Sequence, residues 1–336
     1  MLFIVTGGAG FIGSHLIKKI IANHSDDSNL KIHVLDCLTY ASNIDNLPLN
    51  DNRVELFQID ISSVDQIYAY LKSHQEIRKS TIFHLAAESH VDRSIVDGSN
   101  FISTNITGTF NMLSLAREVD AEKFIHVSTD EVYGSIDFGE ANEENNLNPS
   151  SYYSSSKAAS DLIALAAFKT LSTPVIVTRC VNNFGENQHP EKFLPRMVGR
   201  LARGLALPLY GDGTNIREWI HVEDHVNALI AVSRSLHFGE VFNIGSGFRL
   251  SNIEILNSLM AISDSTSRVD FVQDRLGHDK RYALNSTKIA AKTGWSVTDT
   301  KEKFKAYINE SLVKSREGNF IPDSKFNASE EFYNGI

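Results

Sequence analysis

The sequence has very few cysteines. Cys37 and Cys180 are the only two among 336 residues, and they are too far apart in the chain to form a CxxC pair. Two cysteines are too few for a disulfide scaffold. His221 and His225 have the i, i+4 spacing of zinc ligands on a helix, but the glutamate between them is misplaced for a metalloprotease motif. The remaining histidines form no ligand cluster, so we expect no metal site. Reduced thiols are typical of a reducing compartment, which predicts a cytoplasmic protein.

Positive charge and long apolar runs are also scarce. The 32 lysines and arginines are outnumbered by 41 acidic residues, giving a net charge of −9. Such a surface repels nucleic acids and anionic membranes, so neither is expected as a partner. No run approaches 18 apolar residues, and the N-terminus lacks the basic segment of a signal peptide, so no membrane span is expected. A local basic pocket for a small anion remains compatible with this charge.

Short apolar, β-branched runs recur along the chain, and helical patterns lie between most of them. Near-continuous apolar runs of this length are typical of strands covered on both faces. Their alternation with helices predicts an α/β fold with a Rossmann-like, doubly wound parallel sheet. The expected strands are residues 2–5, 32–35, 54–57, 81–85, 124–127, 175–178 and 241–244.

The alternation of strands and helices ends after residue 181, where segments rich in proline, glycine and polar residues begin. The strand-like run 241–244 indicates that the chain returns once to the main sheet. We therefore predict a smaller, discontinuous C-terminal substrate domain. The expected division is 1–181 plus about 216–245 for the larger, Rossmann-like domain, about 182–215 plus 246–325 for the smaller one, and 326–336 as a tail with little pattern.

A glycine-rich segment, TGGAGFIG at residues 6–13, follows the first expected strand and precedes a helix. Glycines there allow a sharp turn and let backbone N–H groups approach a pyrophosphate at the helix N-terminus. Asp36 ends the second expected strand, where a carboxylate binds a ribose 2′-hydroxyl and repels a 2′-phosphate. The pattern favours NAD over NADP. A glycine turn that serves only packing is the alternative interpretation.

Asp60 ends the third expected strand at the same edge of the sheet. At that position its carboxylate is placed to accept a hydrogen bond from the amino group of adenine. Aspartate also favours helix N-caps, so both interpretations stay open.

Tyr153 and Lys157 are spaced i and i+4, which places them on one face of a helix. A neighbouring ammonium favours the phenolate, so we expect it to lower the pKa of the tyrosine toward the working pH. A phenolate so placed accepts a hydroxyl proton while hydride leaves the same carbon.

Asp130 and Glu131 directly follow the expected strand 124–127, and the carboxyl ends of parallel strands face the ligand crevice. Like charges held close together raise one of the two pKa values. The pair is therefore a candidate proton donor and acceptor. The alternative is a pair of helix-capping acids on the surface.

Taken together, these motifs resemble the dTDP-glucose 4,6-dehydratases, which belong to the extended short-chain dehydrogenase/reductases. The similar stretches run in order from residue 6 to residue 285, and the Asp-Glu signature separates dehydratases from their relatives. They include TGGAGFIGS (6–14), LTYASN (38–43), HLAAESHVDRSI (84–95), STDEVYG (128–134), YSSSKAASD (153–161), PEKFLP (190–195), LPLYGDG (207–213), REWIHVEDH (217–225) and DRLGHDKRYALN (274–285).

The resemblance implies an NAD+-dependent hydro-lyase that converts dTDP-glucose to dTDP-4-keto-6-deoxyglucose and water. Tyr153, helped by Lys157, would take the proton of the 4-hydroxyl while hydride leaves C4. Glu131 would then remove the C5 proton, and Asp130 would protonate the departing 6-hydroxyl before hydride returns to C6. Thr129 would hold the 4-oxygen. The family also implies a homodimer.

The resemblance further implies two sets of binding residues. For NAD they are Gly7, Gly10, Phe11, Ile12, Gly13, Asp36, Thr39, Asp60, Ile61, Ala86, Tyr153 and Lys157. For the nucleotide sugar they are Ser89, His90, Asn183, Lys192, Leu194, Pro208, Tyr210, Arg217, Asn243, Arg275 and His278. For Arg217, a surface ion pair with Glu218 or Asp224 is the alternative.

Three other functions remain as alternatives. Tyr152, Val181 and Leu276 depart from the family pattern, which leaves UDP-glucose as a second candidate substrate. A nucleotide-sugar 4-epimerase or decarboxylase would use the same fold, although an epimerase needs no acid pair for water loss. A regulatory protein that senses NAD without turnover is the non-enzymatic alternative.

Overall fold

Seven parallel strands form the main sheet of the computed structural model, which describes residues 1–263, 265–318 and 320–335. The strand order is β10-β6-β5-β4-β1-β2-β3, and every neighbouring pair is parallel. The expected Rossmann-like sheet is therefore confirmed. The strands are β1 (Leu2–Thr6), β2 (Lys31–Asp36), β3 (Val54–Gln58), β4 (Thr81–His84), β5 (Lys123–Thr129), β6 (Val175–Cys180) and β10 (Val241–Ile244).

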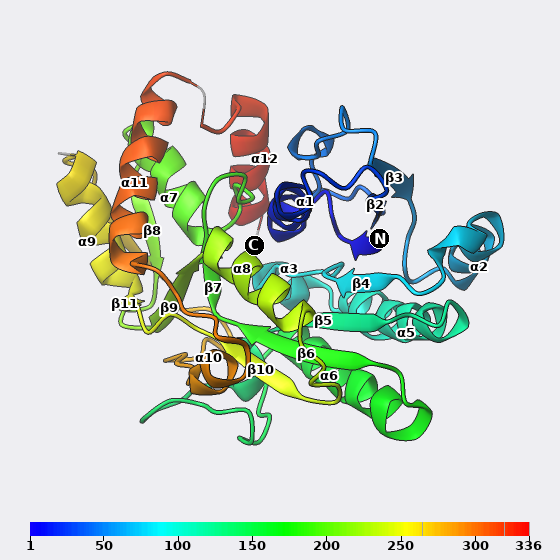
Figure 1. The fold of residues 1–336 in the computed structure, drawn as a ribbon. Helices are drawn as coiled ribbons and strands as arrows, with labels where there is room; N and C mark the ends of the chain where they lie inside the picture. The colour runs from blue at the N-terminus through cyan, green and yellow to red at the C-terminus, as the bar shows by residue number, and fades with distance from the viewer. Residues whose placement is uncertain (264, 319, 336) are drawn as a thin grey trace.

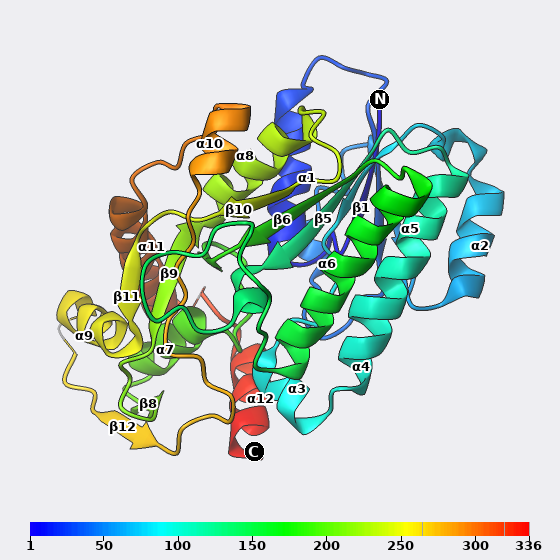
Figure 2. The ribbon, with the colours of Figure 1, turned by 90° about the horizontal axis from the view of Figure 1, so that it is seen from below.

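Helices cover both faces of this sheet, which explains its near-continuous apolar strands. Successive strand residues point to opposite faces, so Ile4 and Val5 belong to two different apolar clusters. The cluster around Val5 includes side chains of α1 (Phe11–Asn23) and α8 (Val222–Ser233). The cluster around Ile4 includes side chains of three other helices, which lie along one face in Figure 2. These are α2 (Val64–Ser73), α5 (Thr109–Glu118) and α6 (Tyr152–Leu171).

The strand order reverses at β1, which pairs with β2 on one side and β4 on the other. In open α/β sheets, ligands bind outside the carboxyl ends of the strands at such a switch point. The connections that follow β4 and β5 are long and consist of short helical segments and loops. They contain α3 (Val91–Val96), α4 (Ser99–Phe101), the π-helix η3 (Ile102–Gly108) and the 3-10 helix η4 (Asp130–Tyr133); η1 (Ile44–Asn46) and η2 (Gln75–Ile77) lie in other loops.

A smaller part of the protein stands at one end of the main sheet and has its own apolar core, which includes Phe184, Trp219 and Phe304 (Figure 1). Its strands form a three-stranded sheet, β11-β9-β7, and a two-stranded sheet, β12-β8. These strands are β7 (Asn182–Phe184), β8 (Leu207–Tyr210), β9 (Ile216–His221), β11 (Arg249–Ser251) and β12 (Val269–Val272). Its helices are α7 (Phe193–Ala202), α9 (Asn252–Ser263) and α11 (Thr300–Arg316), while α10 (Thr287–Thr293) lies beside β10.

The structure differs in two places from the expected division. Strand β9 was expected within the NAD-binding part, but it pairs with β7 and β11 in the smaller sheet, and the chain returns to the main sheet only with α8 and β10. Residues 326–334 of the expected tail belong to a helix, α12 (Asp323–Asn334). That helix is held by contacts distant in sequence, which a local pattern does not reveal. No helix in the described ranges is long and apolar enough to cross a membrane.

Candidate active site

One cavity lies at the carboxyl ends of the main strands and extends toward the smaller part. All five candidate catalytic residues line it: Thr129, Asp130, Glu131, Tyr153 and Lys157. So do the other residues expected to bind NAD: Gly7, Gly10, Phe11, Ile12, Gly13, Asp36, Thr39, Asp60, Ile61 and Ala86. The topology therefore brings both sets together around a single volume.

The glycine turn leaves no room for side chains. Gly7 has a φ of 68°, and a Cβ on it would lie 2.8 Å from the backbone of Ala86. A Cβ on Gly13 would lie 2.4 Å from the carbonyl oxygen of Gly7. Gly10 is the N-cap of α1 and supplies no capping side chain, so the first N–H groups of that helix stay available to an anion.

Hydrogen bonds accepted by Asp36 link the end of β2 to this turn. Its Oδ2 accepts a hydrogen bond from the Ala9 amide (2.9 Å). Its Oδ1 accepts from the Leu38 amide (2.9 Å) and the Ser42 hydroxyl (2.7 Å). These bonds hold a carboxylate at the cavity wall, where it suits a ribose hydroxyl and disfavours a 2′-phosphate.

Asp60 is not the N-cap of the following helix. The N-cap of α2 is Ser63, whose side chain accepts from the Gln66 amide. Asp60 instead accepts from the amide and the hydroxyl of Ser62, both at 2.8 Å. The N-cap interpretation is therefore wrong, and the carboxylate of Asp60 lies at the cavity wall.

The acid pair sits in η4, directly after β5 ends at Thr129. The hydroxyl of Thr129 accepts from the Glu131 amide (3.3 Å) and donates to Oδ1 of Asp130 (3.2 Å). The turn ends at Gly134, which adopts a φ of 69°. One threonine side chain thus holds both acids at the carboxyl end of the strand.

Asp130 is buried in surroundings that favour its neutral form. Burial raises the pKa of Asp130 well above its usual range, and the charges of Glu131 and Glu218 raise it further. Its Oδ2 has no hydrogen-bond partner within the described part of the chain. These surroundings favour the protonated form, which a general acid needs.

Glu131 has different surroundings. Burial raises the pKa of Glu131 too, but three positive charges oppose this. The three are Arg275, Arg217 and Lys192, all from the smaller part or the segment that enters it. Two adjacent carboxyl groups thus occupy unlike environments, as an acid and a base require.

Helix α6 presents Tyr153 and Lys157 to the same cavity. A capping box starts the helix: the Ser151 hydroxyl accepts from the Ser154 amide (3.1 Å), and the Ser154 hydroxyl accepts from the Ser151 amide (3.0 Å). The first turn is therefore fixed, and so is the position of Tyr153 within it.

The expected effect of Lys157 on the pKa of Tyr153 is not seen. Burial raises the pKa of Tyr153 above its usual range and the Glu131 carboxylate adds to this, while a hydrogen bond with Thr129 opposes it. Lys157 is itself buried, which lowers its pKa to about 8. Its ammonium donates to the carbonyl of Val127 (2.8 Å). The prediction omitted the cost of placing a phenolate in a dry site beside a carboxylate.

Four of the expected sugar-binding residues also line the cavity: Ser89, His90, Asn183 and Lys192. The Lys192 ammonium donates to the carbonyl of Ser89 (2.8 Å), which joins the smaller part to the loop after β4. The Asn183 amide group donates to the carbonyl of Val181 (3.0 Å) and accepts from His225 (3.0 Å).

Arg217 forms neither of the ion pairs considered for it. Glu218 pairs with Arg249 (2.8 Å), and Asp224 pairs with a lysine of α11. The guanidinium of Arg217 donates to the carbonyl of Asp279 (2.9 Å), and its charge lowers the pKa of Glu131. The surface-pair alternative is therefore wrong.

The other expected substrate residues are not part of the cavity wall. Tyr210 and His278 contact each other with ring centroids 6.2 Å apart. Pro208 lies in β8, and Leu194 is buried in the apolar core of the smaller part. Asn243 is fully buried in β10, where its Oδ1 accepts from a tyrosine hydroxyl (2.8 Å), so the structure gives it a packing role.

Sequence reasoning missed several residues near the cavity. Tyr40, Glu88 and His189 line it. Tyr40 lies within the LTYASN motif, which offered a signal. Tyr333 belongs to the distant helix α12, and no motif marks it.

Comparison with known proteins agrees with this geometry. The sequence model of the GDP-mannose 4,6 dehydratase family matches residues 4–309. The chain belongs to this family. It is 45% identical to the low-salt glycan biosynthesis protein Agl12 of Haloferax volcanii, over 87% of this chain and 92% of that protein. It is 43% identical to the dTDP-glucose 4,6-dehydratase of an Actinoplanes species, over 88% of this chain and 92% of that protein. The resemblance to the dTDP-glucose 4,6-dehydratases is thus confirmed.

Solved structures give the same result. DesIV, the dTDP-glucose 4,6-dehydratase of Streptomyces venezuelae, crystallised with NAD, is 40% identical to this chain with a TM-score of 0.88, covering 96% of this chain and 99% of that one. The UDP-glucose 4-epimerase of Thermus thermophilus, also solved with NAD, is 26% identical with a TM-score of 0.83, covering 94% and 99%. A dehydratase and an epimerase thus share this fold, so the residues of the site must distinguish between the two reactions.

Proposed function

We propose that this protein is an NAD+-dependent hydro-lyase that converts dTDP-glucose to dTDP-4-keto-6-deoxyglucose and water. The unlike environments of Asp130 and Glu131 carry this proposal. Loss of water from C5 and C6 needs a base for the C5 proton and an acid for the 6-hydroxyl. A buried, protonated Asp130 and a Glu131 faced by three cations meet these two needs.

The site residues suit NAD. The uncapped N-terminus of α1 provides N–H groups for a pyrophosphate, and Asp36 and Asp60 provide carboxylates for ribose and adenine. When bound, NAD supplies the hydride acceptor and donor that this internal redox reaction needs. The cavity residues that we assign to it are those predicted from the sequence.

The chain's own residues move the protons. Tyr153 acts as a phenolate, which the ammonium of Lys157 stabilises. It takes the proton of the 4-hydroxyl and becomes a neutral phenol. Glu131 takes the C5 proton, which the 4-ketone has made acidic. Asp130 donates its proton to the 6-oxygen, which leaves as water, and Thr129 orients both acids.

The alternatives have less support. An epimerase needs no acid pair, and a protein that only senses NAD needs no Tyr153–Lys157 pair beside its ligand. Named relatives at about 40–45% identity act on dTDP-glucose by their names, which favours this nucleotide over UDP. We assign the diphosphate to Lys192, Arg217 and Arg275, the cations whose charges act on Glu131.

We also propose a homodimer. Helices α5 and α6 pack side by side, and η3 continues into α5 (Figure 2). Ile102, Phe110 and Leu162 on these elements are 54%, 59% and 60% exposed. A second copy that packs the same helices across a two-fold axis would cover these side chains. The cytoplasmic location stays a prediction.

The test is to incubate the protein with dTDP-glucose, UDP-glucose and dTDP-galactose without added reductant. Mass spectrometry should find the loss of one water from dTDP-glucose, with no net NADH. Glu131→Gln should abolish water loss yet still give transient NADH absorbance, while the exposed Glu310→Gln should behave as wild type. No water loss from any of the sugars would refute the function, and normal dehydration by Glu131→Gln would refute the role of that residue.

A further inference from the structure

Helix α12 lies between α7 of the smaller part and α3 of the NAD-binding part (Figure 2). On the α7 side, the Glu330 carboxylate binds the guanidinium groups of Arg196 (2.9 Å) and Arg200. Phe326 packs against Gly199, where a Cβ would lie 3.1 Å from the ring. Ion pairs and the packing of Phe326 thus hold one side of α12 against α7. It also lies beyond residues 4–309, which the family model matches.

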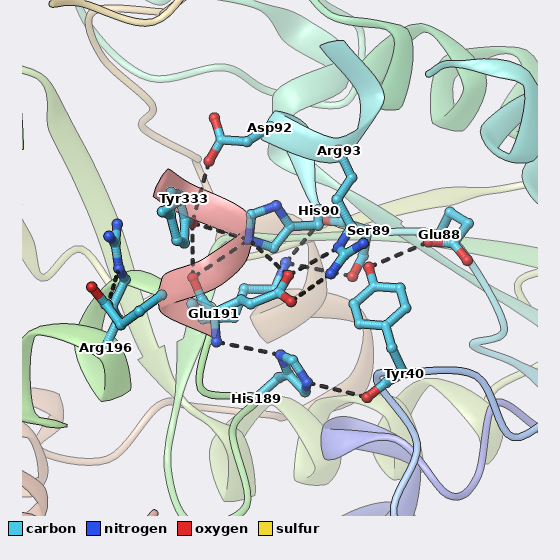
Figure 3. A network of polar contacts seen from close by, with 12 residues as sticks. Tyr40, Glu88, Ser89, His90, Asp92, Arg93, His189, Glu191, Arg196 and Tyr333 are labelled. Carbon is cyan, nitrogen blue, oxygen red and sulfur yellow. Dashed lines mark hydrogen bonds and ion pairs between the residues drawn. The ribbon is translucent and has the colours of Figure 1, made fainter. Parts of the chain in front are cut away.

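The other side of α12 reaches the wall of the cavity through Tyr333 (Figure 3). The Tyr333 hydroxyl lies 3.0 Å from the carbonyl of Glu191 and 3.3 Å from Oδ2 of Asp92. It also lies 3.2 Å from Nε2 of His90, which lines the cavity. The guanidinium of Arg196 stacks on the ring at 3.4 Å. Tyr333 therefore joins α3, the segment before α7, and α7 itself.

Two of these contacts lead to cations near Glu131. Asp92 lies 3.7 Å from the guanidinium of Arg275. Glu191 directly precedes Lys192 in the chain. Arg275 and Lys192 are two of the three cations that lower the pKa of Glu131.

Arg93 reinforces the same segment. Its guanidinium donates to both carboxylate oxygens of Glu191, at 3.0 and 2.6 Å. The guanidinium also lies between two aromatic rings, 4.0 Å from the centroid of Tyr40 and 4.4 Å from that of Phe332. Phe332 neighbours Tyr333 on α12, so the helix holds Glu191 both directly and through Arg93.

We propose that Tyr333 is a positioning residue, which holds Lys192 and Arg275 in place beside Glu131 and the diphosphate of the substrate. This inference rests on the proposed function. The C-terminal helix α12 would thus contribute to the active site through Tyr333, although no residue of α12 lines the cavity.

Loss of the hydroxyl has a defined expected effect. With Lys192 and Arg275 less well fixed, Glu131 should hold its proton to higher pH, and the diphosphate should bind less tightly. The acid limb of kcat/KM should therefore move to higher pH. The ionisable groups that face Glu131 are Asp130, Tyr153, Lys192, Arg217, Arg275, Asp279 and Tyr282.

The test compares Tyr333→Phe with Tyr68→Phe in the full chain. Tyr68 is 54% exposed on α2, so its variant makes the same chemical change away from the site. Because a single hydrogen bond is lost, KM for dTDP-glucose should rise about three- to tenfold in Tyr333→Phe, with a smaller fall in kcat. The acid limb should shift upward only in this variant. An unchanged KM and pH profile, with or without a lower thermal midpoint, would overturn the proposal.

Calorimetry with dTDP separates this proposal from the proposed function. If wild type binds dTDP but does not dehydrate dTDP-glucose, the function fails, and weaker dTDP binding by Tyr333→Phe still supports the positioning role. In that case, equal dTDP affinity of wild type and Tyr333→Phe would overturn the positioning role. If wild type does not bind dTDP, both proposals fall.

Discussion

Replacing Asp130 with asparagine should make the protein more stable and far less active. Asparagine keeps an oxygen that can accept from Thr129 and carries no charge, so it imitates the protonated side chain. It has no proton to give to the departing 6-hydroxyl. Because general acid catalysis contributes roughly 10²–10⁴-fold, dehydration should slow by about that factor.

The gain in stability follows from the raised pKa of Asp130. An unfolded aspartate loses its proton above about pH 3.9, whereas the folded protein retains it until the raised pKa is reached. Over that interval wild type loses stability as the pH rises, by about 1.4 kcal/mol per pH unit. Asp130→Asn has no such group. Its free energy of unfolding should therefore equal that of wild type near pH 4 and exceed it increasingly toward neutral pH.

Urea denaturation at about pH 5, 6 and 7 measures this difference. Asp161→Asn is the matched control, because Asp161 is equally buried but pairs with Arg179 (2.9 Å). Burial raises the pKa of Asp161, but His126 and Arg179 together outweigh this and lower it. The control should lose about 3–5 kcal/mol at neutral pH, the cost of breaking a buried ion pair. A destabilised Asp130→Asn, or a gain in stability that does not grow with pH, would refute the protonated Asp130.

Two further predictions concern the cofactor turn and the dimer. Gly13→Ala places a Cβ 2.4 Å from the carbonyl oxygen of Gly7, so it should destabilise the protein by about 1–3 kcal/mol and weaken NAD binding measured by calorimetry. Wild-type affinity would contradict the close approach of backbone in this turn. Phe110→Glu with Leu162→Glu should convert the proposed dimer to a monomer in light scattering. A dimer that survives both changes would show that the interface lies elsewhere.

The sequence predicted the main sheet, the glycine turn and the acid pair because all three depend on local signals. Strands covered on two faces are apolar throughout, and each of the seven runs became a strand of the sheet. The glycine turn and the Asp130–Glu131 pair follow strands directly, so knowing the strand is enough to place them at the ligand edge.

Features that depend on distant contacts could not be predicted in this way. Tyr333 reaches the site from a helix whose sequence shows no motif, and its partners His90 and Asp92 lie more than 240 residues away. The pKa of Tyr153 depends on burial and on Glu131, neither of which follows from its spacing to Lys157. Strand β9, with the sequence IREWIH, lacks the near-continuous apolar run that marks the main strands, and its pairing with β7 and β11 assigns it to the smaller sheet.

The proposed acid role of Asp130 and base role of Glu131 depend on how the two parts of the protein pack together. The acids come from the end of β5 in the main sheet. All three cations that favour the ionised form of Glu131 come from other segments: Lys192 precedes α7, Arg217 lies in β9, and Arg275 follows β12. Without those cations, burial would raise the pKa of Glu131 further. In the proposed mechanism, base catalysis at C5 therefore depends on the position of the smaller part against the main sheet. The contacts that hold it there would contribute to catalysis without touching the sugar.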